Sequence, residues 1–392
     1  MAKFIHRELE DELRSAARSF PAVVLTGPRR SGKTYLLRRV FPDATYVLAE
    51  DPDVVARLRA DPQGFLDELR LPVILDEIQN VPEVFAFVRA RIDRKPRKMG
   101  QWILTGSQEA SLMQNVTESM AGRAAILQLL PLSVRESSKV TPFRGGYPEV
   151  IQRPSTARLW LSSYLQTYLE RDVRQVLQVR DLAVFRRFLA LLAARHGQIL
   201  NKTDLAAPLG VSIPTITQWL SVLETTLQIA LVPPFYENLG KRLIKSPKLY
   251  FFDSGLVCHL LGIESESELR RSPLRGAIFE GFIAAEIIKS QLHRGRRREI
   301  YYFRDQQGLE VDFLFPGKSR TIHLVEAKAG VTVDPRMAEP MRKLADAFHA
   351  RDSGARITMT LVHEAPKTKS AAGSSASPGL LARSWPEWAR SL

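Results

Sequence analysis

The sequence holds a single cysteine, Cys258, among its 392 residues. One thiol excludes an internal disulfide framework and a cysteine-rich zinc site, and it is typical of a reducing cytoplasm. Apolar runs are short too: the longest clean one, residues 188–194, is far below the roughly 18 residues that span a membrane. The first twenty residues carry too many charges for a secretory signal peptide. We therefore expect a cytoplasmic protein without a membrane span.

Acidic residues are in short supply. There are 56 Lys and Arg against 42 Asp and Glu, a net charge of +14, and residues 271–392 carry +7 of it. A basic balance of this size favours DNA, or an anionic membrane surface, as a partner. Arginines at 294 and 296–298 precede an aromatic strand, which fits either a nucleic-acid backbone contact or a solvated loop. At roughly 100–200 residues per domain, the length predicts two to three domains.

The first 150 residues alternate short apolar strands with amphipathic helices, which predicts an α/β fold with a parallel sheet between helices. One strand, 22–26, runs into a glycine-rich turn and then a helix. The turn matches G-x-x-x-x-G-K-[ST], the phosphate-binding loop (P-loop). Its backbone N–H groups surround phosphate oxygens, and its lysine reaches the β- and γ-phosphates. The predicted ATP-binding residues are Gly27, Pro28, Arg29, Arg30, Ser31, Gly32, Lys33 and Thr34.

A further apolar strand, 72–75, ends in Asp76 and Glu77. Ligands of open α/β sheets bind at the carboxyl ends of the strands, so these acids belong beside the phosphate loop. We expect Asp76 to bind the cofactor and, with the Thr34 hydroxyl, to hold Mg²⁺. Glu77 is expected to polarise the attacking water.

Two further residues complete the predicted hydrolytic site. Ser107, with Thr105 as the alternative, follows the neighbouring strand and is expected to contact the γ-phosphate or the water. Arg123 is a candidate arginine finger acting in a neighbouring subunit, which makes a homo-oligomer possible. An ordinary surface cation is the alternative for Arg123.

The middle of the chain is nearly all helical in its periodicity. Residues 204–220 show a short helix, a glycine turn and a second helix, the helix-turn-helix pattern, and two strands within 235–252 would add a wing. DNA binding and protein contact are both open for such a module. The residues suited to bases or phosphates are Ser212, Thr215, Thr217 and Gln218 in the helix and Lys241, Arg242, Lys245 and Lys248 in the wing.

Carboxylates gather near the C-terminus. Strand alternation places Glu310 and Asp312 on one face, with Val311, Phe313 and Phe315 on the other. Acids on adjacent strands and a helix bind Mg²⁺ through oxygens, and a neighbouring lysine can activate water for attack on phosphate. Charged strand faces in solvent are the alternative. The predicted metal ligands are Glu280, Asp312 and Glu326, and the predicted catalytic residues are Asp312, Glu326 and Lys328.

Together these motifs resemble the AAA-type P-loop ATPases of bacteria and archaea whose C-terminal domain of unknown function is related to the PD-(D/E)xK nucleases. The match is strongest in residues 27–34, 73–79, 104–107, 120–123, 145–150, 252–256, 276–286 and 310–315 with 325–328. The resemblance implies ATP and Mg²⁺ as cofactors, a winged-helix region, and a restriction-endonuclease-like C-terminal α/β fold. It places no sensor-two arginine; Arg171 and Arg174 are candidates only.

The expected organisation is an ATPase domain (1–150), a helical lid with a winged helix-turn-helix (151–253), a nuclease-like domain (254–365) and a flexible tail (366–392). The expected function is Mg²⁺-dependent ATP hydrolysis coupled to action on DNA, with a C-terminal site that either cuts DNA or is inert. The alternative is an ATP-dependent switch or scaffold that binds DNA or protein through the winged helix.

Overall fold

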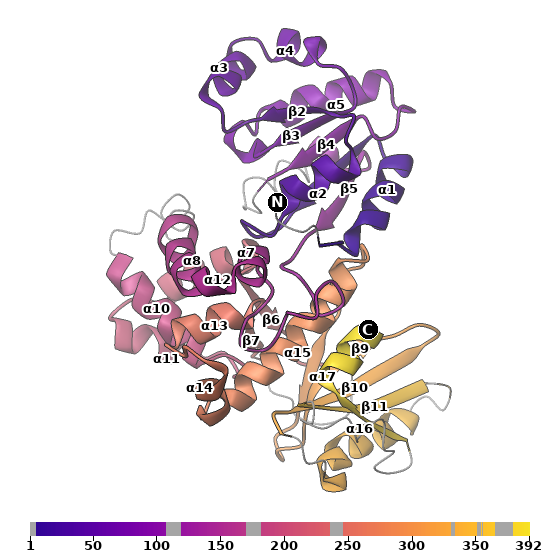
Figure 1. Cartoon of the computed structure of the whole chain (residues 1–392). Coiled ribbons are helices and arrows are strands. Elements are labelled where there is room, and N and C mark those ends of the chain that lie inside the picture. Colours follow the sequence, from indigo (N-terminus) through magenta and orange to yellow (C-terminus); the bar gives the residue numbers. More distant parts are fainter. Residues whose placement is uncertain are drawn as a thin grey trace.

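The computed structural model describes the following parts of the chain: residues 5–106, 119–169, 182–235, 246–330, 334–350, 354, 356–364 and 379–392. Figure 1 shows an N-terminal α/β part, a helical middle part and a C-terminal sheet. Helix α15 (Arg275–Leu292) contacts elements of both the middle part and the C-terminal sheet. No helix in these stretches combines the length and the apolarity that a membrane crossing requires.

The N-terminal part is a five-stranded parallel sheet in the order β2-β3-β4-β1-β5. Alternate strand residues enter two cores, one against α1 and α2 and the other against α3, α4 and α5. The predicted parallel α/β fold is therefore confirmed. The strands are β1 (Ala22–Thr26), β2 (Thr45–Leu48), β3 (Val73–Asp76), β4 (Trp102–Thr105) and β5 (Ala124–Gln128). The helices are α1 (Leu9–Ser19), α2 (Lys33–Val40), α3 (Pro52–Ala60), α4 (Pro62–Glu68) and α5 (Val84–Arg94).

The middle part packs its helices around one apolar core, with the short antiparallel pair β6–β7 at its border. Ser212 begins α12 by accepting a hydrogen bond from the Thr215 backbone N–H, as an N-cap should. The predicted wing loop, with Lys241, Arg242 and Lys245, lies outside the described residues. The elements are α7 (Pro148–Gln152), α8 (Ala157–Tyr164), α10 (Leu182–Ala194), α11 (Lys202–Ala206), α12 (Ile213–Thr225), β6 (Ile229–Val232), β7 (Lys248–Phe251), α13 (Ser254–Leu260) and α14 (Glu266–Arg271).

The C-terminal sheet has the order β12-β11-β10-β9-β8, with antiparallel pairing from β8 to β10 and parallel pairing from β10 to β12. One face packs against α15 and α17, and the other packs against α16. The elements are β8 (Tyr301–Arg304), β9 (Glu310–Pro316), β10 (Thr321–Lys328), α16 (Glu339–His349), β11 (Arg356–His363), β12 (Leu380–Ser384) and α17 (Trp385–Ser391).

Two sequence expectations for this part are wrong. Val311 packs in the core around α16, whereas Phe313 and Phe315 pack in the core around α15. The β8–β9 register shifts at this point, and such a bulge turns one side chain to the opposite face. Residues 380–391 are not a flexible tail, because β12 extends the sheet and Trp388 of α17 is buried beside α15.

Removing the Trp388 side chain tests whether this last segment is part of the core. Trp388→Ala should lower the free energy of unfolding by about 3–5 kcal/mol, because it empties a large buried volume. Leu381→Ala, on the exposed side of β12, should change it by less than about 1 kcal/mol. Urea unfolding followed by circular dichroism measures the free energy of unfolding of both variants. Equal losses of stability in the two variants would contradict the burial of Trp388.

Candidate nucleotide site and carboxylate cluster

The phosphate loop joins β1 to α2 at the carboxyl edge of the parallel sheet (Figure 1). Gly27 has φ +150°, and a Cβ there would lie 2.2 Å from the Leu129 carbonyl oxygen, so only glycine fits. The Lys33 ammonium donates to the carbonyl oxygens of Gly27 at 3.0 Å and Pro28 at 3.1 Å. The lysine therefore lies folded over the loop it belongs to.

Asp76 lies at the end of β3 and is almost fully buried. Its Oδ2 accepts hydrogen bonds from the Thr34 hydroxyl at 2.7 Å and from the Tyr46 hydroxyl at 2.8 Å. Burial and the bond to Asp76 raise the pKa of Tyr46 above its ordinary value, so the phenol stays a donor. The structure thus brings the predicted pair Thr34 and Asp76 together and adds Tyr46, for which the sequence holds no motif.

The other predicted hydrolytic residues differ in their placement. Glu77 has a left-handed backbone, φ +55°, and its carboxylate accepts from Gln79 and lies 4.0 Å from the Arg29 guanidinium. Thr105 is buried at the end of β4, and its hydroxyl has no hydrogen-bond partner within the described part of the chain. Ser107 lies outside the described residues.

Arg123 lies just before β5, so it sits at the opposite edge of the sheet from the phosphate loop. Its guanidinium forms an ion pair with Asp93 at 2.6 Å on the surface. This pair holds the arginine away from the nucleotide site of its own chain. A role in a neighbouring subunit stays a prediction.

A cavity of about 660 Å³ lies over the phosphate loop. Its wall includes the loop from Arg29 onward, together with Tyr46, Asp76 and Glu77. Arg7, before α1, and the α7 residues Pro148, Glu149 and Gln152 close the cavity from the other side. The middle part of the chain therefore supplies one wall of the site.

The residues present fit ATP and Mg²⁺. The Gly27 cradle admits backbone only, and the Ser31 hydroxyl is buried without a partner among the residues described. Thr34 and Asp76 offer hydroxyl and carboxylate oxygens, the donor type that Mg²⁺ prefers. Loop N–H groups at the N-terminus of α2 would hold the phosphates.

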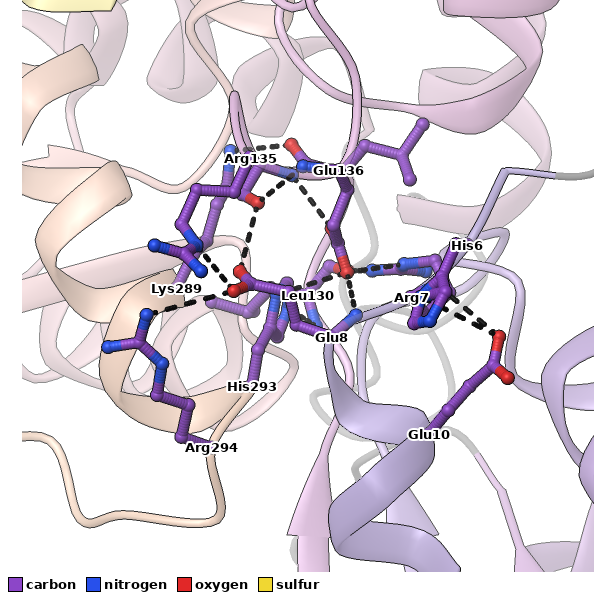
Figure 2. A network of polar contacts seen from close by, with 12 residues as sticks. His6, Arg7, Glu8, Glu10, Leu130, Arg135, Glu136, Lys289, His293 and Arg294 are labelled. Atoms are coloured by element: carbon purple, nitrogen blue, oxygen red, sulfur yellow. Dashed lines mark hydrogen bonds and ion pairs between the residues drawn. The ribbon is translucent and has the colours of Figure 1, made fainter. Parts of the chain in front are cut away.

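Arg7 joins the phosphate loop to the rest of the chain, and Figure 2 shows its contact with Glu136. Its guanidinium donates to the Ser31 carbonyl at 2.8 Å, to the Leu130 carbonyl at 2.7 Å and to the Glu136 carboxylate at 2.9 Å. Burial alone would raise the pKa of Glu136, but Arg7 lowers it to about 2. The buried glutamate is therefore charged at neutral pH.

Helix α15 enters the same network from its C-terminal end (Figure 2). The Leu130 N–H donates to His293 Nε2 at 3.2 Å, so the ring proton is on Nδ1, which points at Glu136 from 3.5 Å. Burial lowers the pKa of His293 to about 4, so the ring is neutral at pH 7. One turn earlier, Lys289 donates to the Leu132 carbonyl and to Glu286. We call this set of contacts the polar junction.

The predicted C-terminal acids do come together. Asp312 accepts from the Ala327 N–H at 2.9 Å, and Glu326 accepts from Lys328 at 2.6 Å. Burial and the nearby Asp312 raise the pKa of Glu280 to about 7 and that of Glu326 to about 8. Yet the described residues hold no group of three or more acids, histidines or cysteines arranged to bind a metal ion.

Lys248 explains this arrangement and corrects the expectation for that residue. It is not a solvent-facing wing cation, because its side chain is 4% exposed and it begins the buried strand β7. Its ammonium lies 2.9 Å from Glu280, 2.7 Å from Glu310 and 4.0 Å from Asp312. Burial alone would lower the pKa of Lys248, but these acids raise it above its ordinary value, so the lysine stays charged.

Replacing Arg7 tests the polar junction. Arg7→Ala should lower the free energy of unfolding by about 3–5 kcal/mol, because it leaves the Glu136 charge buried without its cation. The matched control is Arg14→Ala, which removes an arginine on the exposed side of α1 and should cost less than about 1 kcal/mol. Denaturant unfolding measures both, and a mild effect of Arg7→Ala would show that the junction contributes little.

Three family models match successive parts of the chain. Residues 19–138 match an AAA domain, residues 137–267 match a domain of unknown function (DUF8612), and residues 275–371 match another domain of unknown function (DUF4143). Among solved structures, a Walker-type ATPase of Pyrococcus abyssi is 16% identical with a TM-score of 0.44, covering 64% of this chain and 94% of that one. A signal transduction ATPase with numerous domains from Pyrococcus horikoshii is also 16% identical, with a TM-score of 0.23, covering 73% and 48%.

Two curated relatives extend over most of the chain. They are the uncharacterized proteins Rv2008c of Mycobacterium tuberculosis and Mb2031c of Mycobacterium bovis, each 35% identical over 315 residues. The alignment covers 78% of this chain and 70% of each relative. The AAA match and the geometry around the phosphate loop support ATP binding by the N-terminal part. The chain belongs to the family of these mycobacterial proteins and carries an AAA-type P-loop domain at its N-terminal end.

Proposed function

We propose that this protein hydrolyses ATP with Mg²⁺ and uses the cycle to act on DNA. ATP hydrolysis is supported above all by the partly buried Thr34–Asp76 hydrogen bond, which lies beside a phosphate loop that opens into a ligand-sized cavity. Bound Mg²⁺ would neutralise charge that develops on the phosphates during transfer. Thr34 and Asp76 would hold it, and Tyr46 would keep the Asp76 carboxylate oriented.

The remaining residues act on phosphate and water. Lys33 exchanges its two carbonyl partners for phosphate oxygens, which are stronger acceptors because they carry charge. Glu77 takes up the proton of the attacking water, and Gln79 and Arg29 fix its carboxylate before that step. Thr105 brings a buried hydroxyl from the adjacent strand.

The DNA half rests on the surface around α12. Its exposed face carries Thr217 and Gln218. Arg298 pairs with Glu224 near the end of the same helix at 3.1 Å, which places the basic stretch before β8 beside it. Arg296 and Arg297 in that stretch are exposed. Cations next to a polar helix suit a phosphate backbone with a helix in the groove.

The polar junction favours a conformational use of ATP. Arg7 contacts the phosphate loop through Ser31 and contacts α15 through Glu136 and His293. A change in the loop on nucleotide binding would reach both later parts of the chain through these contacts. The alternative function is an ATP-dependent switch, which would hydrolyse ATP slowly and without stimulation by DNA. The rate of hydrolysis with and without DNA therefore distinguishes a switch from an ATPase that acts on DNA.

Two substitutions test the nucleotide site. Lys33→Ala should abolish ATP binding, because it removes the phosphate-binding cation. Glu77→Gln should retain ATP binding but slow hydrolysis at least about 100-fold, since the amide cannot take a proton. Nucleotide fluorescence and phosphate release measure the two effects, with exposed Lys98→Ala as the control. Unchanged ATP affinity in Lys33→Ala would overturn the assignment.

A salt titration tests the DNA surface. The double variant Arg296→Ala, Arg297→Ala should weaken duplex binding and reduce the salt dependence by about two released ions, because each lost phosphate contact releases one fewer counterion. The control is Arg57→Ala, Arg59→Ala on α3, which removes two other exposed arginines, both in the ATPase part. Fluorescence anisotropy at several salt concentrations gives both slopes. If the double variant and the control variant show the same salt dependence, DNA binds at another surface or does not bind.

A further inference from the structure

The C-terminal carboxylates surround a cation that belongs to the chain itself. The Lys248 ammonium contacts Glu280 of α15 and Glu310 of β9 within 2.9 Å, and Asp312 lies 4.0 Å away. These acids come from a helix and a strand of the C-terminal part, while the lysine begins a strand of the middle part. The centre of the cluster is thus occupied by positive charge.

Lys248 is fixed in place by its strand. β7 pairs with β6, and the Lys248 backbone also bridges to Ile199. Its ammonium lies 5.5 Å from the centre of the Tyr302 ring, and the Tyr302 hydroxyl donates to the Ser246 carbonyl two residues earlier. Tyr250 and Tyr302 share one buried core with α15 and β9, so the lysine cannot swing out like a surface side chain.

The carboxylate oxygens closest to the Lys248 ammonium are already engaged. Glu280 accepts from Lys248 and Tyr250, and Glu310 accepts from Lys248 and pairs with Arg304 at 3.2 Å. Asp312 accepts from a backbone N–H, and one oxygen of Glu326 accepts from Lys328. The second Glu326 oxygen is buried without a partner in the described stretches. The ammonium thus stands where the carboxylates converge, and a divalent ion, which takes several oxygen ligands, would have to displace it.

We infer that Lys248 is the resident cation of this cluster, in the place where a divalent metal ion would otherwise bind. The cluster then works as a clamp that holds β7, α15 and β9 together, and the C-terminal part does not hydrolyse phosphodiesters through a metal. Glu280 at one end of α15 is fixed by this clamp, and His293, just past its other end, is fixed by the polar junction. The inference does not depend on ATP hydrolysis.

Manganese binding to the nucleotide-free full-length chain tests the clamp. Electron paramagnetic resonance reports free Mn²⁺, and the background variant Asp76→Asn removes the carboxylate expected to bind metal at the nucleotide site. In this background we expect no Mn²⁺ binding up to millimolar concentrations. Adding Lys248→Met should create a binding site, because it leaves the acids without their cation. The matched control Lys248→Arg keeps the charge and should create none.

A second variant keeps the test decisive even when Lys248→Met fails to fold. Asp76→Asn with Asp312→Asn should show the same lack of Mn²⁺ binding as Asp76→Asn alone. The inference is overturned when Asp76→Asn binds Mn²⁺ and Asp312→Asn abolishes that binding. Incubation of the wild-type chain with Mn²⁺ and single-stranded, duplex and branched DNA should give no cleavage. Cleavage that disappears in Asp312→Asn overturns it as well.

Discussion

The buried ion pair between Arg7 and Glu136 is the contact on which the arrangement of the whole chain depends. Removing two charges from water is costly, and the pair is stable only when every remaining hydrogen-bonding group is satisfied. Here the partners come from the phosphate loop, from the segment after β5 and from the backbone of Glu8 and Ser133. The pair is therefore satisfied only when these segments are assembled, and it selects one arrangement of the nucleotide site against α15.

Helix α15 then acts as a rigid link between two charged centres. Its 18 residues span about 27 Å at 1.5 Å per residue. Near its start Glu280 meets the Lys248 ammonium, and just past its end His293 receives the Leu130 N–H. A helix buried along most of its length cannot bend freely between such fixed ends. Movement at the polar junction would therefore reach the C-terminal sheet as displacement of the whole helix.

Sequence reasoning recovered the residues that a motif or the edge of a sheet identifies and missed those that belong to no motif. The phosphate loop follows from its local spacing between a strand and a helix, and Asp76 and Glu77 follow because ligands bind at the carboxyl ends of parallel strands. Arg7, Tyr46 and Lys248 belong to no motif, and each meets a partner at least 30 residues away. The last strand, β12, follows a polar stretch of sequence and was therefore assigned to the flexible tail. A bulge turns the Val311 side chain to the other face of the sheet, which strict alternation cannot predict.

Two of the buried lysines, Lys33 and Lys248, have opposite relations to their sites. Lys33 donates to carbonyl oxygens of its own loop, which are neutral acceptors, so phosphate oxygens compete for it successfully. Lys248 donates to buried carboxylates, and withdrawing it would leave several negative charges in a medium that solvates them poorly. The first lysine is therefore available to a ligand and the second is not. The same residue type marks an exchangeable site in the N-terminal part and a permanent joint between the middle part and the C-terminal part, because the charge on the acceptors differs.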